Sequence, residues 1–341
     1  MQRLRDIEPF LCAPTTPLRE VLARINELPH QFQIVVSDTR VLMGTVTDGD
    51  IRRALLAGVG LRDAVEHCMN TAPLRLTVDD LPVRLPQHYD FVPIIDADNT
   101  VREIALPLTA QREPPVCLVM AGGFGTRLGE RTRTKPKPLL EVGGKPILER
   151  ILQRLETAGI RTIFVSTHYL SEQIDAFVDQ RHGTANVRPI KEHAQLGTAG
   201  AVGLLPRSGD SPLLVINGDI VSSIDLQAFW DFHLEREYDA TIAASLYEVS
   251  VPYGVLDTDS DGLLLAVDEK PTYNYYVAAG IYCLSASVRD LVPNGHKVDM
   301  PDLLMRARER GLRVGVFPMH EYWRDVGLPD DLVAADEEQS T

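Results

Sequence analysis

VMAGGFGTRLGERTRTKPKPLLEVGGKP, residues 119–146, joins an apolar run to a cluster of glycines and then to a series of basic residues. The chain of 341 residues carries a formal net charge of −14, yet residues 127–150 hold seven Lys or Arg against three Glu. Glycines at the carboxyl end of a strand let backbone N–H groups approach a ligand closely. The stretch predicts an anion-binding turn, with a solvated surface loop as the plain alternative.

Two common phosphate-binding motifs do not fit these glycines. The dinucleotide fingerprint G-x-G-x-x-G would need a glycine where Leu128 stands, and no G-x-x-x-x-G-K-[ST] is present. Because α/β proteins bind ligands at the carboxyl edge of a parallel sheet, we expect the glycines and the cations after them to face nucleotide phosphates. The glycines are Gly122, Gly123 and Gly125, and the cations are Arg127, Arg131, Arg133, Lys135 and Lys137.

Strand and helix patterns alternate after residue 115. Apolar runs at 116–123, 162–168 and 212–219 read as buried strands, separated by amphipathic helices at 147–159 and 171–181, the second with Ser171 as its N-cap. Such alternation predicts a Rossmann-like, mostly parallel sheet covered on both faces. We expect this α/β domain to span residues 116–341.

The first third of the chain has a different, repeated pattern. Residues 18–28 predict a helix, 32–47 two strands, and 48–58 a second helix; a weaker copy over 69–108 has its helix interrupted by Pro82 and Pro86. The proline-rich segment 111–116 predicts a linker. We therefore expect a smaller α+β domain of two related units over residues 1–112.

Composition excludes several classes of protein. An acidic chain is unlike a general nucleic-acid binder, which would show a basic face. No run approaches the ~20 apolar residues that cross a bilayer, and the four scattered cysteines fit neither a disulfide framework nor a zinc site. We expect a cytoplasmic protein that engages neither nucleic acid nor a membrane.

Two acids in distant segments are candidate metal ligands. Asp219 ends the strand of INGD, where taken alone it is more typical of a helix N-cap, and Asp325 lies in YWRDVG near the chain end. Mg²⁺ accepts one or two carboxylates while keeping phosphate and water ligands. The two acids are compatible with such a site if the fold brings them together.

The motifs G-G-x-G-T-R-L, K-P-K-P-L and G-G-K-P, in this order, resemble the signature of sugar-1-phosphate nucleotidyltransferases over residues 116–335. The resemblance implies that Lys137 stabilises charge at the α-phosphate and that Asp219 and Asp325 hold Mg²⁺. It also implies that the leaving phosphates are bound by Arg127 and by the backbone of the turn, which contains Gly122, Gly123, Gly125 and Thr126.

The same resemblance extends to the other substrates. It implies that the G-T-A-G loop, with Gly197 and Thr198, lies against the base, and this form of the loop favours GTP. In VPYGVL and VDEKP, it implies sugar and sugar-phosphate contacts for Tyr253, Gly254, Glu269 and Lys270; on a strand, Glu269 and Lys270 would point to opposite faces. Ala278 departs from the family, since many relatives have Asn there to contact the sugar.

The segment MGTVTDGD, residues 43–50, resembles the closing motif of a CBS module, G-x-[VI]-T-x-x-D. The resemblance implies that Thr47 and Asp50 contact an adenosine-type nucleotide, and a purely structural or dimerising pair is the alternative. The second copy lacks the motif. A CBS pair fused to this enzyme resembles the guanylyltransferases of nonulosonic (legionaminic-type) acid pathways, which implies GDP-amino sugar synthesis by a homo-oligomer. The competing interpretation is an inactive, nucleotide-sensing regulator.

Overall fold

A computed structural model describes residues 2–28, 30–77, 90–106, 115–206 and 211–339. By its internal contacts the chain divides into two compact units, 1–113 and 114–341. Most of the expected linker and the expected helix around Pro82 and Pro86 lie outside the described residues. Within the described residues, no helix has the length and apolar character needed to cross a bilayer.

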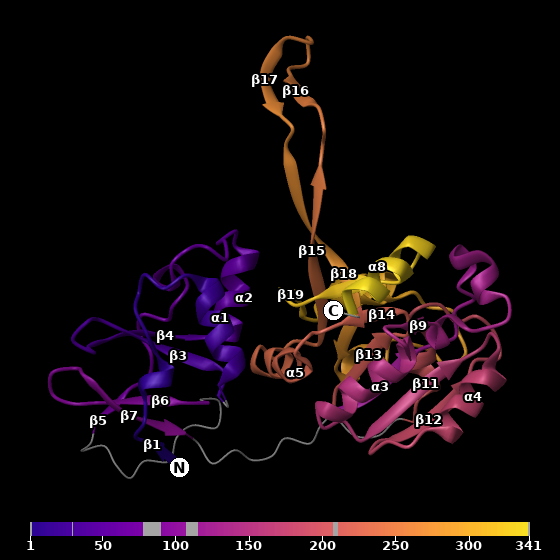
Figure 1. The fold of residues 1–341 in the computed structure, drawn as a ribbon, viewed down its shortest axis with the longest axis horizontal. Coiled ribbons are helices and arrows are strands. Elements are labelled where there is room, and N and C mark those ends of the chain that lie inside the picture. Colours follow the sequence, from indigo (N-terminus) through magenta and orange to yellow (C-terminus); the bar gives the residue numbers. More distant parts are fainter. Residues whose placement is uncertain (1, 29, 78–89, 107–114, 207–210, 340–341) are drawn as a thin grey trace. The chain divides into compact units, whose positions relative to one another are not determined.

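The first unit contains two strand motifs of the same design (Figure 1). In each, a two-residue strand lies parallel to the first strand of an antiparallel hairpin: β2 with β3 and β4, and β5 with β6 and β7, where β1 adds to β7. The elements are β1 (Gln2–Leu4), η1 (Glu8–Phe10), β2 (Leu11–Cys12), α1 (Leu18–Glu27), β3 (Phe32–Val36), β4 (Leu42–Thr47), α2 (Asp48–Leu56), η2 (Val65–His67), β5 (Leu76–Thr77), β6 (Val92–Ile95) and β7 (Val101–Leu106).

The two motifs share a hydrophobic core. Ile34 and Val36 from one hairpin and Ile95 and Ile104 from the other lie in one buried cluster. Neither sheet could bury its apolar face alone, so the repeat is stabilised as a pair.

The second unit is built on a seven-stranded mixed sheet in the order β12-β11-β8-β13-β18-β15-β19. The first four strands are mutually parallel, β18 runs antiparallel to both of its neighbours, and β19 is parallel to β15. The predicted α/β fold class, with a parallel-rich sheet, is confirmed. The strands and short 3₁₀ helices are β8 (Val116–Met120), η4 (Thr126–Thr132), η5 (Lys137–Leu139), β9 (Glu141–Val142), β10 (Lys145–Pro146), β11 (Thr162–Thr167), β12 (Asn186–Lys191), η6 (Gly200–Leu204), β13 (Leu213–Asn217), β14 (Ile220–Ser222), β15 (Ala240–Ser250), β16 (Gly254–Thr258), β17 (Leu264–Glu269), β18 (Thr272–Leu284), β19 (Val314–Met319) and β20 (Trp323–Asp325).

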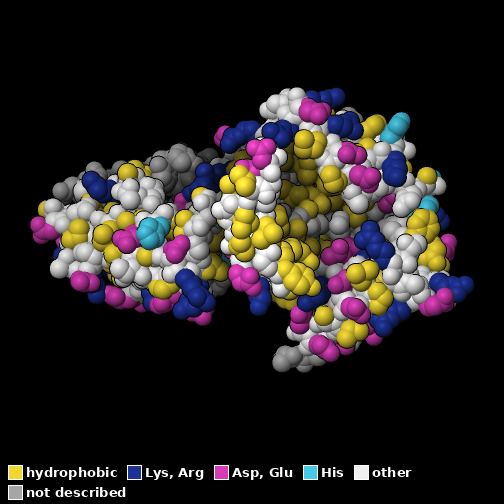
Figure 2. Space-filling view, turned by 90° about the horizontal axis from the view of Figure 1, so that it is seen from above, with side chains coloured by type: hydrophobic (Ala, Val, Ile, Leu, Met, Phe, Trp, Pro, Cys, Tyr) yellow, Lys and Arg dark blue, Asp and Glu magenta, His cyan; other side chains and the backbone are white. Residues whose placement is uncertain are grey.

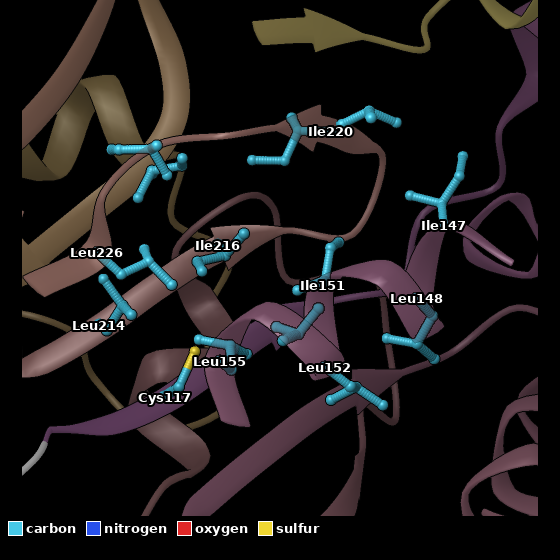
Figure 3. Packing of buried hydrophobic residues seen from close by; sticks show 14 of the residues in the cluster. Cys117, Ile147, Leu148, Ile151, Leu152, Leu155, Leu214, Ile216, Ile220 and Leu226 are labelled. Atoms are coloured by element: carbon cyan, nitrogen blue, oxygen red, sulfur yellow. The ribbon is translucent and has the colours of Figure 1, made fainter. Parts of the chain in front are cut away.

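Helices cover both faces of this sheet, which explains why its central strands are continuously apolar. One face packs against α3 (Ile147–Thr157), α4 (Ser171–Gln180), α5 (Leu226–Glu235) and α8 (Pro329–Gln339); the other packs against η6, α6 (Ala286–Arg289) and α7 (Met300–Glu309). Cys117 and Leu214 meet Ile151 and Leu155 of α3 on the first face (Figure 3). Leu118, the residue after Cys117 in β8, points to the opposite face.

The N-caps of two helices differ from those that the sequence suggested. Ser171 is the first residue of α4 and makes no cap; Leu170 precedes it in a left-handed conformation, with φ 51°. The helix after INGD is capped by Asp225, whose side chain accepts hydrogen bonds from the N–H groups of Gln227 and Ala228. Asp219 is therefore not used as a cap.

A long two-stranded projection leaves the sheet between β15 and β18. The strands pair from Ala244–Ala278 out to Ser250–Thr272, and β16 and β17 continue the hairpin to its tip. Figure 1 shows it standing clear of the body of the second unit. Residues 246–276 are called the arm below.

Candidate active site

The candidate site forms where β8 and β13 end side by side. These parallel neighbours are in register up to the pair Asn217–Met120, and the Gly218 N–H donates to the Met120 carbonyl at 2.8 Å. Any Cβ at Gly218 would lie 2.6 Å from that carbonyl oxygen, so only glycine allows the two strand ends to approach this closely. The glycine-rich turn and Asp219 consequently leave the sheet at one place.

Asp325 reaches this place from a distant part of the chain. Strand β20 pairs with β14 so that Asp325 lies opposite Ile220, and the Val326 N–H donates to the Asp219 carbonyl at 3.0 Å. The fold thus brings together the two acids that the sequence proposed as one site.

Lys137 joins the two carboxylates. Its Nζ donates to Asp219 Oδ2 at 2.5 Å and lies 3.9 Å from Asp325 Oδ1. Since both oxygens reach one atom, they are separated by no more than about 6.4 Å, the sum of these two distances. The Lys137 side chain is only 12% exposed, so its charge acts where water screens it weakly.

Two acids and one lysine leave an excess of negative charge in this cluster. Burial and then the charge of Asp219 raise the pKa of Asp325, while Lys137 and, more weakly, Arg127 act to lower it. The cluster would accommodate a further cation, and carboxylate oxygens are donors that suit a hard divalent ion.

The glycine turn lies directly against Lys137. Gly125 adopts φ 63°, and a Cβ there would come within 3.1 Å of Lys137 Cβ and 3.0 Å of Thr132 Cγ2. Gly123 has open space around it, and Thr126 is exposed at the start of η4. The turn therefore presents accessible backbone beside the lysine, as a phosphate-binding turn requires.

The other cations of the motif divide into two groups. Arg127 is exposed and close enough to influence Asp325. Lys135 instead bonds to Glu141 and Arg133 to Glu130, all at the exposed surface. Neighbouring acids thus engage Arg133 and Lys135 in this structure, and a phosphate contact by these two or by Arg131 stays a prediction.

The G-T-A-G loop is tied to the start of α7. The Thr198 N–H donates to Asp299 Oδ1 at 3.1 Å, and the Met300 N–H donates to Thr198 Oγ1 at 2.8 Å. Gly197, at φ 76°, has no room for a Cβ because Asp299 Oδ1 would lie 2.5 Å away. The Thr198 hydroxyl thus satisfies a free N–H of a helix end, a structural role that the sequence did not indicate.

Glu192 is a site residue that the sequence analysis missed. It follows β12, is buried, and accepts a hydrogen bond from the Leu196 N–H at the G-T-A-G loop. A Cβ on Gly122 would lie 2.8 Å from its other oxygen. One carboxylate therefore spaces the glycine turn from the loop, and an acid shortly before the G-T-A-G motif was the available signal.

The residues expected at the sugar lie together, but on the arm. Gly254 pairs with Glu269, and the Lys270 N–H donates to the Tyr253 carbonyl at 3.3 Å. Tyr253 is 74% exposed. Strand β17 ends at Glu269 and Lys270 takes a left-handed φ of 51°, so the expected strand alternation of these two residues is wrong. Ala278 is exposed near the base of the arm, opposite Ala244.

In the first unit, Thr47 and Asp50 bond to each other. The Asp50 N–H donates to Thr47 Oγ1 at 3.2 Å, and the Thr47 N–H and Oγ1 donate to Asp50 Oδ2 at 2.9 and 2.8 Å. This capping box starts α2. A nucleotide contact by these residues stays a prediction.

Family models match the second unit and the first half of the first unit. A family model described as nucleotidyl transferase matches residues 116–341, and one described as CBS domain matches residues 4–57. The mannose-1-phosphate guanyltransferase of Debaryomyces hansenii is 31% identical over 230 residues, covering 64% of this chain and 62% of that one. The mannose-1-phosphate guanylyltransferase of Mycobacterium tuberculosis is 31% identical over 226 residues, covering 63% and 62%.

Among solved structures, HddC from Yersinia pseudotuberculosis is similar at 27% identity and a TM-score of 0.51, over 66% of this chain and 99% of that chain. It has also been crystallised in complex with GMP-PN, with the same scores. The chain spans about three fifths of the length of the curated relatives it matches. Since the nucleotidyl transferase match extends over more than half of the chain and ends at its last residue, the chain belongs to the nucleotidyl transferase family.

Proposed function

We propose that the second unit transfers a nucleotidyl group from a nucleoside triphosphate, with GTP favoured, to a sugar 1-phosphate. The products are an NDP-sugar and pyrophosphate. The observation that carries this proposal is Lys137 Nζ held between Asp219 and Asp325, directly beside the glycine turn. The relatives named as mannose-1-phosphate guanyltransferases and the HddC complex with GMP-PN support the guanine base.

The reaction needs charge control more than proton transfer. An oxygen of the sugar 1-phosphate, already anionic, attacks the α-phosphorus; the bond to the β-phosphate bridging oxygen breaks, and pyrophosphate leaves with the electron pair. Lys137 offsets the charge that develops at the α-phosphate. Arg127 and the N–H groups around Gly123 hold the departing phosphates. Positioning and preorganised charge supply most of the rate in such transfers.

Asp219 and Asp325 fit a divalent cation, which we propose to be Mg²⁺. Their oxygens already lie within about 6.4 Å, and the pair carries one negative charge beyond what Lys137 offsets. A magnesium ion bound there would neutralise the α-phosphate, with phosphate and water oxygens completing its coordination. The chain's own contribution is to hold both acids on the paired strands β14 and β20.

The sugar is proposed from the residues that differ from the family. Ala278 cannot make the amide contact that Asn would make, so a substituent other than the usual hydroxyl is favoured at that position. A glucosamine-type sugar 1-phosphate, consumed in nonulosonic acid or other surface-glycan synthesis, is consistent with the fused CBS domain.

A substrate matrix tests this function. Purified full-length protein is incubated with Mg²⁺, each of the four NTPs, and mannose-, glucose- and glucosamine-1-phosphate, and pyrophosphate is measured. We expect release with GTP, highest with the amino sugar. Release with mannose 1-phosphate alone would refute the amino-sugar proposal, and no release with any pair, while GTP still binds, would favour a nucleotide-sensing regulator.

A further inference from the structure

The arm exposes more apolar surface than a free hairpin tolerates. Twelve of the twenty exposed large hydrophobic side chains of the described residues lie within residues 246–276. At about half exposure, side chains of this size present on the order of 1,000 Å². Soluble monomers rarely leave a patch of this size uncovered, and a lone two-stranded hairpin is marginally stable in water.

The apolar side chains of the paired strands are concentrated on one face. Tyr247 pairs with Tyr275 and Val249 with Tyr273, so all four lie on that face, while Leu246 and Tyr276 share the other face with Glu248 and Asn274. Nearer the tip, Leu256 pairs with Val267, on the same face as the pair Gly254–Glu269. The side chains of Tyr247, Val249, Tyr273 and Tyr275 thus form an apolar face that is suited to burial.

The arm cannot serve the site of its own chain in this conformation. Gly280, in the same strand, lies against Asn217, two residues before Asp219. Strand β18 is continuous from Thr272 to Leu284, and the ten residues from Gly280 to Lys270 extend about 33 Å at about 3.3 Å per residue. Lys270 and Glu269 therefore lie about 30 Å from the acids with which they would share one sugar phosphate.

The body of the second unit offers a matching surface. A sugar phosphate bound beside Lys137, Asp219 and Asp325 would bring negative charge of its own, which Lys270 would offset. Leu328, three residues after Asp325, is 53% exposed, and Phe124 of the glycine turn is 40% exposed. Figure 2 shows hydrophobic side chains both on the arm and in the hollow beside it.

We infer that two copies of this chain exchange arms, so that Glu269 and Lys270 of one copy complete the sugar-phosphate site formed by Lys137, Asp219 and Asp325 of the other. This inference rests on the proposed function and adds the source of its sugar-binding residues. A two-fold exchange makes both sites equivalent, and the exposed arm area matches the ~800 Å² that each partner of a stable dimer buries.

Mixing two inactive variants tests the exchange directly. Lys270→Ala, with one affinity tag, and Asp219→Ala, with another, are co-expressed, and hybrids are isolated on both tags. In an exchanged hybrid, the body of the first chain meets the intact arm of the second, so one of its two sites is whole. We expect each variant alone to lose activity ~100-fold or more and the hybrid to regain about half of the wild-type activity per dimer.

A second cross is the matched control. Asp219→Ala with Asp325→Ala places both changes on the body, so no arrangement of arms rebuilds a site, and this hybrid stays inactive. A Lys270→Ala/Asp219→Ala hybrid that forms but is as inactive as its parents would overturn the exchange, whether the arm bends onto its own body or only contacts another arm. A monomeric wild-type protein by light scattering would overturn it as well.

A chemical readout separates this inference from the proposed function. Lys270→Cys in one tagged chain and Leu328→Cys in the other are treated with a short bis-maleimide, with each single variant and the wild type as controls. A cross-link specific to the hybrid supports the exchange even if the wild type releases no pyrophosphate from any substrate pair. Its absence, in a hybrid whose cysteines both react with a monofunctional maleimide, counts against the exchange independently of activity.

Discussion

The acid–lysine cluster, which consists of Lys137, Asp219 and Asp325, and the arm differ in how the fold holds their candidate site residues. Asp219, Asp325 and Lys137 come from segments far apart in sequence, yet strand pairing and direct bonds fix them to one another. Tyr253, Glu269 and Lys270 are close in sequence, lie on exposed backbone, and have no support from the sheet behind them. The residues proposed for the phosphate chemistry thus lie together within one chain, while those proposed for sugar recognition lie away from them on the arm.

The largest effect is expected from removing the charge at the centre of the fixed region. Lys137→Ala should lower kcat about 10³-fold, because a preorganised, weakly screened cation is lost where charge develops. The measurement is steady-state pyrophosphate release, with circular dichroism to confirm folding. Lys135→Ala is the matched control: this lysine bonds to Glu141 at the surface, and its loss should change kcat less than twofold. Equal effects of both changes would contradict the assignment.

The rigidity of the body can be tested at its buried ion pairs. Arg181 is 6% exposed and bonds to both Glu149 and Glu156 of α3. Arg181→Met should lower the free energy of unfolding by about 3 kcal/mol, because two carboxylates lose their buried partner. Urea denaturation at pH 7 measures this loss, and Arg133→Met, at an exposed pair, should cost less than ~0.5 kcal/mol.

The ion pair between Arg181 and Glu156 predicts that the free energy of unfolding depends on pH. The Arg181 guanidinium lowers the pKa of Glu156 from 4.5 to about 2. A pKa depressed by folding stabilises the protein at pH values above 4.5, and this contribution is lost as the pH falls from 4.5 towards 2. Arg181→Met should therefore flatten the acid side of the stability profile. An unchanged slope between pH 4.5 and 2.5 would show that other groups control it.

On the arm, the apolar face formed by Tyr247, Val249, Tyr273 and Tyr275 should control assembly. Tyr247→Asp with Tyr275→Asp should raise the dimer dissociation constant at least ~100-fold, since buried aromatic anchors contribute about 2 kcal/mol each. Light scattering over a dilution series measures it. Glu248→Gln, on the opposite face, is the control and should leave the constant within a few-fold. Identical dimers from all three proteins would exclude the arm from the interface.

The smallest effect on stability is expected at Thr198, where a structural role of the hydroxyl can be separated from a proposed contact with the nucleotide. Thr198→Val removes the hydroxyl that accepts from the Met300 N–H and should cost about 1 kcal/mol of stability. Thr198→Ser keeps that oxygen and should be close to wild type. If the KM for GTP rises more than tenfold in Thr198→Val but not in Thr198→Ser, the hydroxyl contacts the nucleotide as well.

The sequence could predict the sheet and the phosphate side of the site for a physical reason. Continuous apolar runs, a glycine turn and strand-end acids are local signals, and the parallel sheet then aligns the strand ends without further information. The family resemblance is confirmed by the nucleotidyl transferase match. Roles that depend on distant parts of the chain were harder to predict. Asp219 was compatible with a helix N-cap, and only the structure shows that Asp225 caps that helix. The contact of Glu192 with Gly122 joins segments that are far apart in sequence.

The arm shows a different limit of sequence reasoning. The sequence analysis placed VPYGVL and VDEKP at one sugar site, and Gly254 does pair with Glu269. No local pattern indicates whether these residues serve the site of their own chain or that of a second copy. The Thr47–Asp50 motif has the same limit, because one pair of residues serves as a helix cap and as a family signature.

Strand β18 has a mechanical consequence. It is a single continuous strand that begins two residues after Lys270, lies against Asn217 at Gly280, its one left-handed residue, and ends inside the core. Unbroken backbone therefore connects Lys270 to the glycine that lies against Asn217. If Lys270 binds a sugar phosphate as proposed, a displacement of the arm would be passed along this strand towards Asn217 and Asp219 of its own chain.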